Sequence, residues 1–154
     1  ATIPMGATIV QDLIYESMME NADAPIELFH GYTYSGHPVA CAAALATLDI
    51  YQEEGLFDNA AHMAPIIEEA AHGLKGTKHI IDIRNLGVIA ALELEPKGNA
   101  VGARGFEAMK KAWDLGLMVR ANGDTLAFSP PLIIKENQVD EMFTKVKKAL
   151  EQVD

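Results

Sequence analysis

Cysteine is nearly absent from this chain of 154 residues. Cys41 is the only one, so the chain can form no internal disulfide and no cysteine-rich metal site. Its place in the alanine-rich stretch 40–44 favours a small buried helix residue. Because disulfides are rare in reducing compartments, this cysteine usage predicts a cytoplasmic protein.

Basic residues are also scarce. Lysine and arginine number 12 against 22 acidic residues, which gives a net charge of −10. Such a chain repels the phosphates of a nucleic acid, and no local basic cluster offsets that repulsion. Hydrophobic residues make up 49% of the sequence, but no run approaches the roughly 20 apolar residues of a membrane span. We therefore expect neither a nucleic-acid partner nor a membrane partner.

Several chemical motifs are missing as well. The sequence has no H-x-x-x-H pair and no acid–histidine grouping with the spacing of metal ligands, so no metal site is predicted. It has neither a P-loop nor a G-x-S-x-G elbow. It also lacks an initiator methionine, a basic leader and an apolar signal core. This opening predicts a chain that begins inside a domain.

The sequence does contain segments with helical and with strand periodicity, in a clear order. Pro38 fits the first turn of a helix that Gly55 would end, and Pro65 would kink or split the next helix. The dipeptide Asn122-Gly123 predicts a β-hairpin. The predicted strands span 7–10, 80–85, 88–95, 117–121 and 125–128, and the predicted helices span 11–20, 38–54, 56–74, 106–115 and 136–152. This order predicts an α+β fold, an antiparallel-rich sheet with helices on one face.

The composition of the helices predicts which side chains are buried. The small residues of segment 38–54 would let a neighbour approach closely, so we expect this helix to be substantially buried. Segment 136–152 carries apolar residues at helical spacing, which predicts one core-facing stripe. Tyr51, Phe106 and Trp113 fall at helical positions and are predicted to be core residues rather than stacking platforms.

Thr33 lies in an unusual loop, between Gly31 and Gly36 and just before the helix that starts near Pro38. The free N–H groups and dipole of a helix N-terminus favour an anion, so the hydroxyl of Thr33 could hold a phosphate. Threonine before a helix is more commonly a cap, and that alternative stays open. Tyr32 and Tyr34 flank Thr33, and one of them could line a ligand pocket.

Arg120 stands in a mostly apolar predicted strand, residues 117–121. A guanidinium among apolar residues needs a carboxylate partner, either within the protein or on a ligand. Asp124, across the predicted turn, is the internal candidate. The local sequence leaves both the salt bridge and the ligand site open.

Four segments of the chain resemble the class III aminotransferases, in order and over essentially the whole chain. Residues 29–43 (FHGYTYSGHPVACAA) resemble the block H-G-x-T-Y-S-x-H-P-x-A of that family. The other three are residues 3–7, residues 82–87 with Glu93-Leu94 beyond them, and residues 116–132. The likeness is greatest to the β-alanine (omega-amino acid)–pyruvate transaminases. These are dimeric fold type I enzymes that use pyridoxal 5′-phosphate (PLP), with a large cofactor domain and a smaller C-terminal domain.

The resemblance implies a domain division and three site residues. Residues 1–35 would be the tail of the large domain, and residues 36–154 the connecting helix and the C-terminal small domain. Thr33 matches the threonine that binds the cofactor phosphate across the dimer interface, and Arg120 matches the arginine that binds the substrate α-carboxylate. Tyr32 matches an aromatic position beside the active site and is expected to contact substrate.

The resemblance also implies what this chain does not contain. The Schiff-base lysine of the family would lie upstream of Ala1, and the first lysine here is Lys75, so we expect no catalytic residue in this chain. Asn85 replaces a glycine that is common in the family turn R-G-x-G, which predicts a different backbone there.

The implied function is the transfer of an amino group from an omega-amino acid or amine to pyruvate or a similar keto acid. The parent enzyme would be a homodimer that binds an amino donor and a keto acid, whereas the fragment alone would be inactive and unlikely to retain PLP. The alternative is a free-standing small-molecule-binding or interaction module that shares the small-domain fold. Residues 1–35 distinguish the two, because an independent module would pack this segment and a fragment would leave its apolar face exposed.

Overall fold

The computed structural model describes residues 3–20, 22 and 32–154. The chain divides into two units, Ala1–Glu53 and Glu54–Asp154. The predicted division at residue 35 concerns the domains of a whole enzyme, and it stays a prediction.

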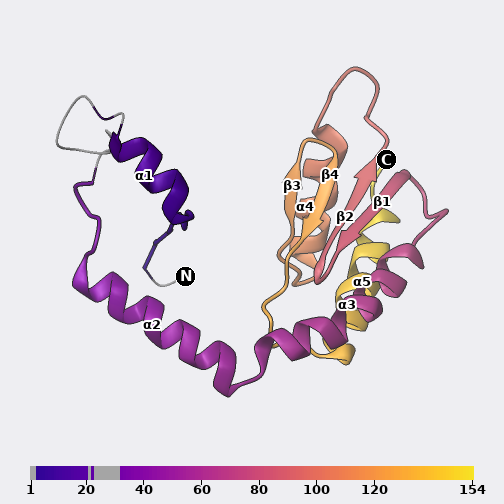
Figure 1. Ribbon diagram of the computed structural model, residues 1–154. Coiled ribbons are helices and arrows are strands. Elements are labelled where there is room, and N and C mark those ends of the chain that lie inside the picture. Colours follow the sequence, from indigo (N-terminus) through magenta and orange to yellow (C-terminus); the bar gives the residue numbers. More distant parts are fainter. Residues whose placement is uncertain (1–2, 21, 23–31) are drawn as a thin grey trace. The chain divides into compact units, whose positions relative to one another are not determined.

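The first unit contains helices α1 (Asp12–Glu20) and α2 (Pro38–Glu53), which confirms both predicted helices (Figure 1). The strand predicted at 7–10 is wrong, because these residues are neither strand nor helix. A strand needs a neighbouring strand for its backbone hydrogen bonds, and the described part of this unit has none.

Helix α2 is far more exposed than its alanine content predicts. Only Ala40 is buried, Cys41 is half-buried, and Leu45 and Leu48 are 63% and 60% exposed. Small side chains permit close packing but do not provide a partner, so the predicted burial is wrong for this chain taken alone.

Near the start of the second unit stands Gly55, whose φ of +60° ends α2 as predicted and is strained for residues other than glycine. Helix α3 (Leu56–His72) follows and continues through Pro65 without a break. Proline removes one helical hydrogen bond. The buried side chains Met63, Ile67 and Ala71 hold both halves of α3 against the same core, so the predicted split does not occur.

A four-stranded antiparallel sheet in the order β1-β2-β4-β3 forms the centre of the second unit. Helices α3, α4 and α5 all cover one face of this sheet (Figure 1). The strands are β1 (Ile80–Leu86), β2 (Ile89–Leu94), β3 (Arg120–Asn122) and β4 (Thr125–Phe128), and the remaining helices are α4 (Ala103–Asp114) and α5 (Glu136–Leu150). The arrangement confirms the predicted α+β fold.

The core lies between the sheet and the helices. Alternate residues of β2, namely Ala90, Leu92 and Leu94, are fully buried, as a sheet with one covered face requires. The predicted apolar stripe of α5 is confirmed, and its Phe143 contacts Phe128 of β4 with ring centroids 5.4 Å apart.

Helix α4 faces the core with small residues, Ala108 and Ala112. Its aromatic residues point outward: Phe106 is 54% exposed and Trp113 is 65% exposed. The predicted core role of both is therefore wrong. Helical spacing alone does not show which face meets the sheet, and here the face of small residues lets α4 approach closely.

Candidate functional site

The face of the sheet that carries no helix presents a row of four paired residues. The register places Arg84, Ala91, Ala127 and Arg120 next to one another across β1, β2, β4 and β3. Alanines occupy the two central positions, so only small side chains lie between the two arginines. The helix-free face therefore carries two guanidinium groups separated by small side chains.

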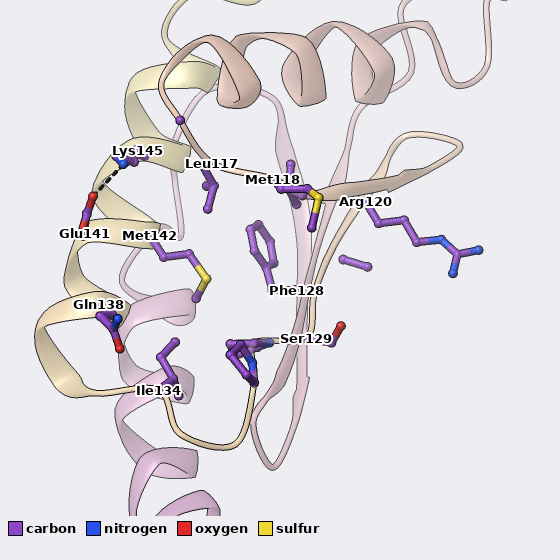
Figure 2. Close-up of a pocket in the computed structure, with 15 residues that line it drawn as sticks. Leu117, Met118, Arg120, Phe128, Ser129, Ile134, Gln138, Glu141, Met142 and Lys145 are labelled. Atoms are coloured by element: carbon purple, nitrogen blue, oxygen red, sulfur yellow. Dashed lines mark ion pairs between the residues drawn. The ribbon is translucent and has the colours of Figure 1, made fainter. Parts of the chain in front are cut away.

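The two arginines differ in their partners. Arg84 forms ion pairs with Asp82, at 2.8 Å, and with Glu93. Arg120 is exposed and forms no ion pair with any described residue. Figure 2 shows its guanidinium extending away from the neighbouring cavity. Arg120 is therefore the arginine of this row that has no acidic partner among the described residues.

Asp124 is not the partner of Arg120, which corrects the salt bridge that the sequence left open. The residue is 8% exposed, and its carboxylate accepts hydrogen bonds from the backbone N–H groups of Gly102, at 2.7 Å, and Gly105, at 3.0 Å. Burial alone would raise the pKa of this carboxyl group, but the N–H donors at the start of α4 outweigh it and lower the pKa. Asp124 is therefore an ionised helix cap.

A cavity of about 650 Å³ lies beside β3, between the sheet and α5 (Figure 2). Phe128, Ile134 and Met142 line its interior, while Glu141 and Lys145 form an ion pair at its edge with N and O atoms 2.6 Å apart. The cavity is thus largely apolar. Arg120 contributes to its wall but directs its charge elsewhere.

The segment that follows β4 is held by a residue that the sequence did not reveal. The side-chain amide of Asn59, on α3, donates to the carbonyl oxygens of Leu132, at 2.6 Å, and Ile134, at 3.1 Å. His62, one turn later, contacts Glu136 at 3.2 Å. The polar pattern of α3 gave no sign of this contact, because its acceptors lie more than 70 residues away.

Thr33 lies in the turn that precedes α2, in the first unit. This turn and residues 3–6 line a second cavity, of about 420 Å³, so two segments of the family resemblance meet there. The capping role that the sequence allowed for Thr33 is not observed, because His37 accepts the N–H of Ala40 at 3.4 Å and Thr33 is exposed. Its hydroxyl is thus not used as the cap of α2.

The sequence also predicted that one of the two tyrosines beside Thr33 lines a ligand pocket. Tyr34 lines the 420 Å³ cavity, and Tyr32 is 46% exposed beside Thr33. His30 and Gly31 lie outside the described residues. Thr33 and Arg120 belong to different units, so the roles implied for them and for Tyr32 stay predictions.

Neither a metal cluster nor a membrane span occurs in the described part of the chain. No three side chains of histidine, cysteine, aspartate or glutamate gather there as metal ligands would. No helix among these residues combines the length and hydrophobicity needed to cross a membrane.

Comparison with known proteins gives the family. The model of the class III aminotransferases matches residues 2–150, and the chain therefore belongs to this family, as its sequence motifs predicted. Class III aminotransferases use PLP.

Among curated proteins, the chain is 48% identical to an omega-aminotransferase of Caulobacter vibrioides, over 100% of the chain and 35% of the relative. It is 44% identical to a β-alanine–pyruvate aminotransferase of Pseudomonas aeruginosa, over 96% of the chain and 34% of the relative. The chain thus spans about a third of the length of these relatives.

Solved structures give the same fold. An omega transaminase of Pseudomonas jessenii, in complex with PMP, matches with a TM-score of 0.74 and 37% identity over 81% of this chain and 29% of that chain. A transaminase obtained by ancestral reconstruction matches with a TM-score of 0.77 and 34% identity, over 92% of this chain and 32% of that one. These neighbours confirm the predicted relation to fold type I transaminases.

Proposed function

We propose that the protein moves an amino group from an omega-amino acid or amine to pyruvate or a similar keto acid, as a PLP-dependent homodimer. In this proposal Arg120 binds the carboxylate of the substrate, Thr33 binds the phosphate of the cofactor, and Tyr32 contacts substrate. The observation that carries it is the exposed guanidinium of Arg120, which has no acid beside it among the described residues and shares a row with two alanines. The names of the relatives, an omega-aminotransferase and a β-alanine–pyruvate aminotransferase, support the choice of substrates.

The position of Arg120 suits both substrates that carry a carboxylate and amines that carry none. Its planar guanidinium can bind a carboxylate through two parallel hydrogen bonds. Strand β3 fixes its backbone, whereas its exposed side chain is free of internal acids among the described residues and can turn aside. An apolar amine substituent would then lie over Ala127 and Ala91 without a buried charge to oppose it.

The turn before α2 carries groups that suit the phosphate group of the cofactor. Thr33 is one of the residues that line the 420 Å³ cavity, and Gly36, with φ of +69°, shapes the turn before the N-terminus of α2. Hydroxyl donors and helix N-termini suit a phosphate group. When bound, PLP supplies the electron sink for the movement of the amino group.

The alternative of an independent binding module is less well supported. Its first residues should be packed, but α1 has no buried residue, and Ile9 and Leu13 are 94% and 74% exposed. Such a surface suits a segment that packs against more of the same protein. A cytoplasmic location stays a prediction from cysteine usage.

Variants of Arg120 in the full-length protein test the proposal. Arg120→Lys keeps the charge but loses the two-pronged geometry, and Arg120→Ala loses both. We expect both to lower kcat/KM for pyruvate, the alanine variant by about 2–4 kcal/mol in transition-state free energy, with simple amines much less affected.

Arg84→Ala is the matched control, since Arg84 lies in the same row but is already paired with Asp82 and Glu93. It should leave the preference for carboxylate substrates unchanged. Equal losses for carboxylate and uncharged substrates in the Arg120 variants would make Arg120 a structural residue and refute the proposal.

A further inference from the structure

The hairpin that carries Arg120 turns directly against the start of α4. Asn122 pairs with Thr125, so Gly123 and Asp124 are the two turn residues, one position later than the sequence predicted. The carboxylate of Asp124 accepts the N–H groups of Gly102 and Gly105, which precede it by 22 and 19 residues. The turn and the helix are therefore joined by an ionised side chain.

These two hydrogen bonds replace a local cap. Gly102 is the N-cap of α4 and has no side chain with which to cap it, and Gly105 is three residues further on. A capping box satisfies the same two N–H groups, those of the N-cap and of the third helical residue, with two local side chains. Here one distant carboxylate satisfies both, so the cap of α4 also fixes the place of the hairpin.

The backbone of the turn has little room to move. A Cβ atom at Gly105 would lie 2.2 Å from the carbonyl oxygen of Gly123 and 2.9 Å from the Cα of Asp124. On the other side, the N–H of Leu94 donates to the carbonyl oxygen of Asp124 at 2.9 Å. The turn is thus held by α4 and by the end of β2 at once.

Strand β3 is the shortest strand of the sheet and leads directly into this turn. It is only three residues long, lies at the edge of the sheet, and pairs with β4 alone. Arg120 is its first residue, four positions before Asp124. Its guanidinium has no ion pair among the described residues, so the backbone of β3 is what fixes the point from which the side chain extends.

We propose that Asp124 is a positioning residue for Arg120: by capping α4 from within the hairpin turn, it fixes the strand from which Arg120 reaches a substrate carboxylate. This inference rests on the proposed role of Arg120. It goes further by assigning selectivity for carboxylate substrates to an ionised residue that touches no substrate.

A double-mutant cycle in the full-length protein tests the proposal. The variants are Asp124→Asn, Arg120→Ala and the two combined. The amide of Asp124→Asn keeps the shape of the side chain but faces one of the two N–H groups with its own donor. We expect it to lower kcat/KM for pyruvate by about tenfold, mainly through KM, with a smaller change for a simple amine, a size usual for coupled neighbours.

In the background of Arg120→Ala, Asp124→Asn should change kcat/KM for pyruvate by less than about twofold, because the residue it positions is gone. Asp114→Asn is the control: it makes the same chemical change at an exposed site of the same helix. Asp124→Ser, which keeps one oxygen acceptor, replaces the amide variant if that variant does not fold.

Three results would overturn the proposal: an equal loss for pyruvate and for the amine, the same loss with and without Arg120, or a failure of both Asp124 variants to fold. Each would make Asp124 a structural residue only. Failure of the proposed function looks different, because Arg120→Ala by itself would then change kcat/KM equally for pyruvate and for the amine, or change neither.

Discussion

Arg104 is a buried cation that joins Asp154 to the residues just before β1 and just after β2. It is 7% exposed and donates to the carbonyl oxygens of Glu95, at 2.6 Å, and Asp154, and to the imidazole Nε2 of His79, at 2.8 Å. A guanidinium cannot accept a hydrogen bond, so His79 must accept at Nε2 and be neutral. Because Nε2 then carries no proton, it cannot also donate a hydrogen bond to the carbonyl oxygen of Val153, which lies 3.3 Å away.

The environment of His79 makes stability depend on pH. Burial lowers its pKa, the carbonyl oxygen of Val153 partly opposes this, and the charges of Arg104 and Lys78 lower it further. Above the ordinary histidine pKa of about 6.5, the residue is neutral in both the folded and the unfolded chain. As pH falls below that value the unfolded chain binds the proton first, so the free energy of unfolding decreases until the folded pKa is passed.

His79→Asn should remove this part of the pH dependence. Asparagine tolerates the φ of +71° found at this position and does not titrate. We expect the wild type to lose more unfolding free energy than the variant between about pH 7.5 and about pH 5.5, measured by urea unfolding of the chain. His62→Asn, at an exposed site, is the control, and identical pH slopes for wild type and His79→Asn would contradict the assignment.

Thr33 gives a second prediction at the scale of one residue. In the full-length protein, Thr33→Ala should weaken retention of the cofactor by about 1–3 kcal/mol, the cost of one charge-assisted hydrogen bond to a phosphate. Thr33→Ser keeps the hydroxyl and should retain most of the affinity. Equilibrium dialysis against PLP measures both, and unchanged affinity in the alanine variant would argue against a phosphate contact.

Single elements were predictable where one physical signal dominates. The apolar stripe of α5, the end of α2 at Gly55 and the pairing of β3 with β4 all follow from local sequence. The errors arise where the answer depends on a neighbour. The segment 7–10 has strand-like residues but no partner strand within the described residues, and Trp113 has helical spacing but lies on the face of α4 away from the sheet.

The residues of the candidate site also divide into those that local sequence reveals and those whose contacts depend on the fold. Arg120 and Thr33 stood out because a charge in an apolar strand, or a hydroxyl between glycines, is locally unusual. Asn59 and Asp124 did not reveal their contacts, because their partners are brought close only by the fold. Periodicity identifies which elements form, but not which polar side chain meets which backbone group.

Asn59 offers a test of how α3 holds the segment after β4. In Asn59→Asp an acceptor of equal size replaces the amide donor and faces the carbonyl oxygens of Leu132 and Ile134. We expect a loss of about 1–3 kcal/mol in unfolding free energy, measured by urea unfolding. Asn99→Asp, the same change at an exposed loop position, should have little effect, and an equal result for the two variants would show that the Asn59 contact contributes nothing.

At the scale of the whole molecule, the two units differ in how much side-chain surface they bury. The described helices of the first unit bury almost nothing: α1 has no buried residue and α2 has one. The second unit has its own core, drawn from α3, α4, α5 and the sheet. The chain also spans only about a third of its relatives, so the proposed reaction belongs to the full-length protein rather than to these two units alone.

The chain Ala1–Asp154 alone should therefore not transaminate, although it contains Arg120 and Thr33. If the family resemblance holds at this point, the Schiff-base lysine that would hold PLP and move protons in the reaction would lie before residue 1. The test is the formation of alanine from pyruvate, with β-alanine as donor, by the isolated chain and by the full-length protein at equal concentrations. Borohydride treatment in the presence of PLP, followed by peptide mass analysis, shows whether any lysine is modified specifically. We expect turnover and one modified lysine only in the full-length protein; turnover by the isolated chain, or specific modification of a residue such as Lys75, would place the reactive lysine within this chain and refute the assignment.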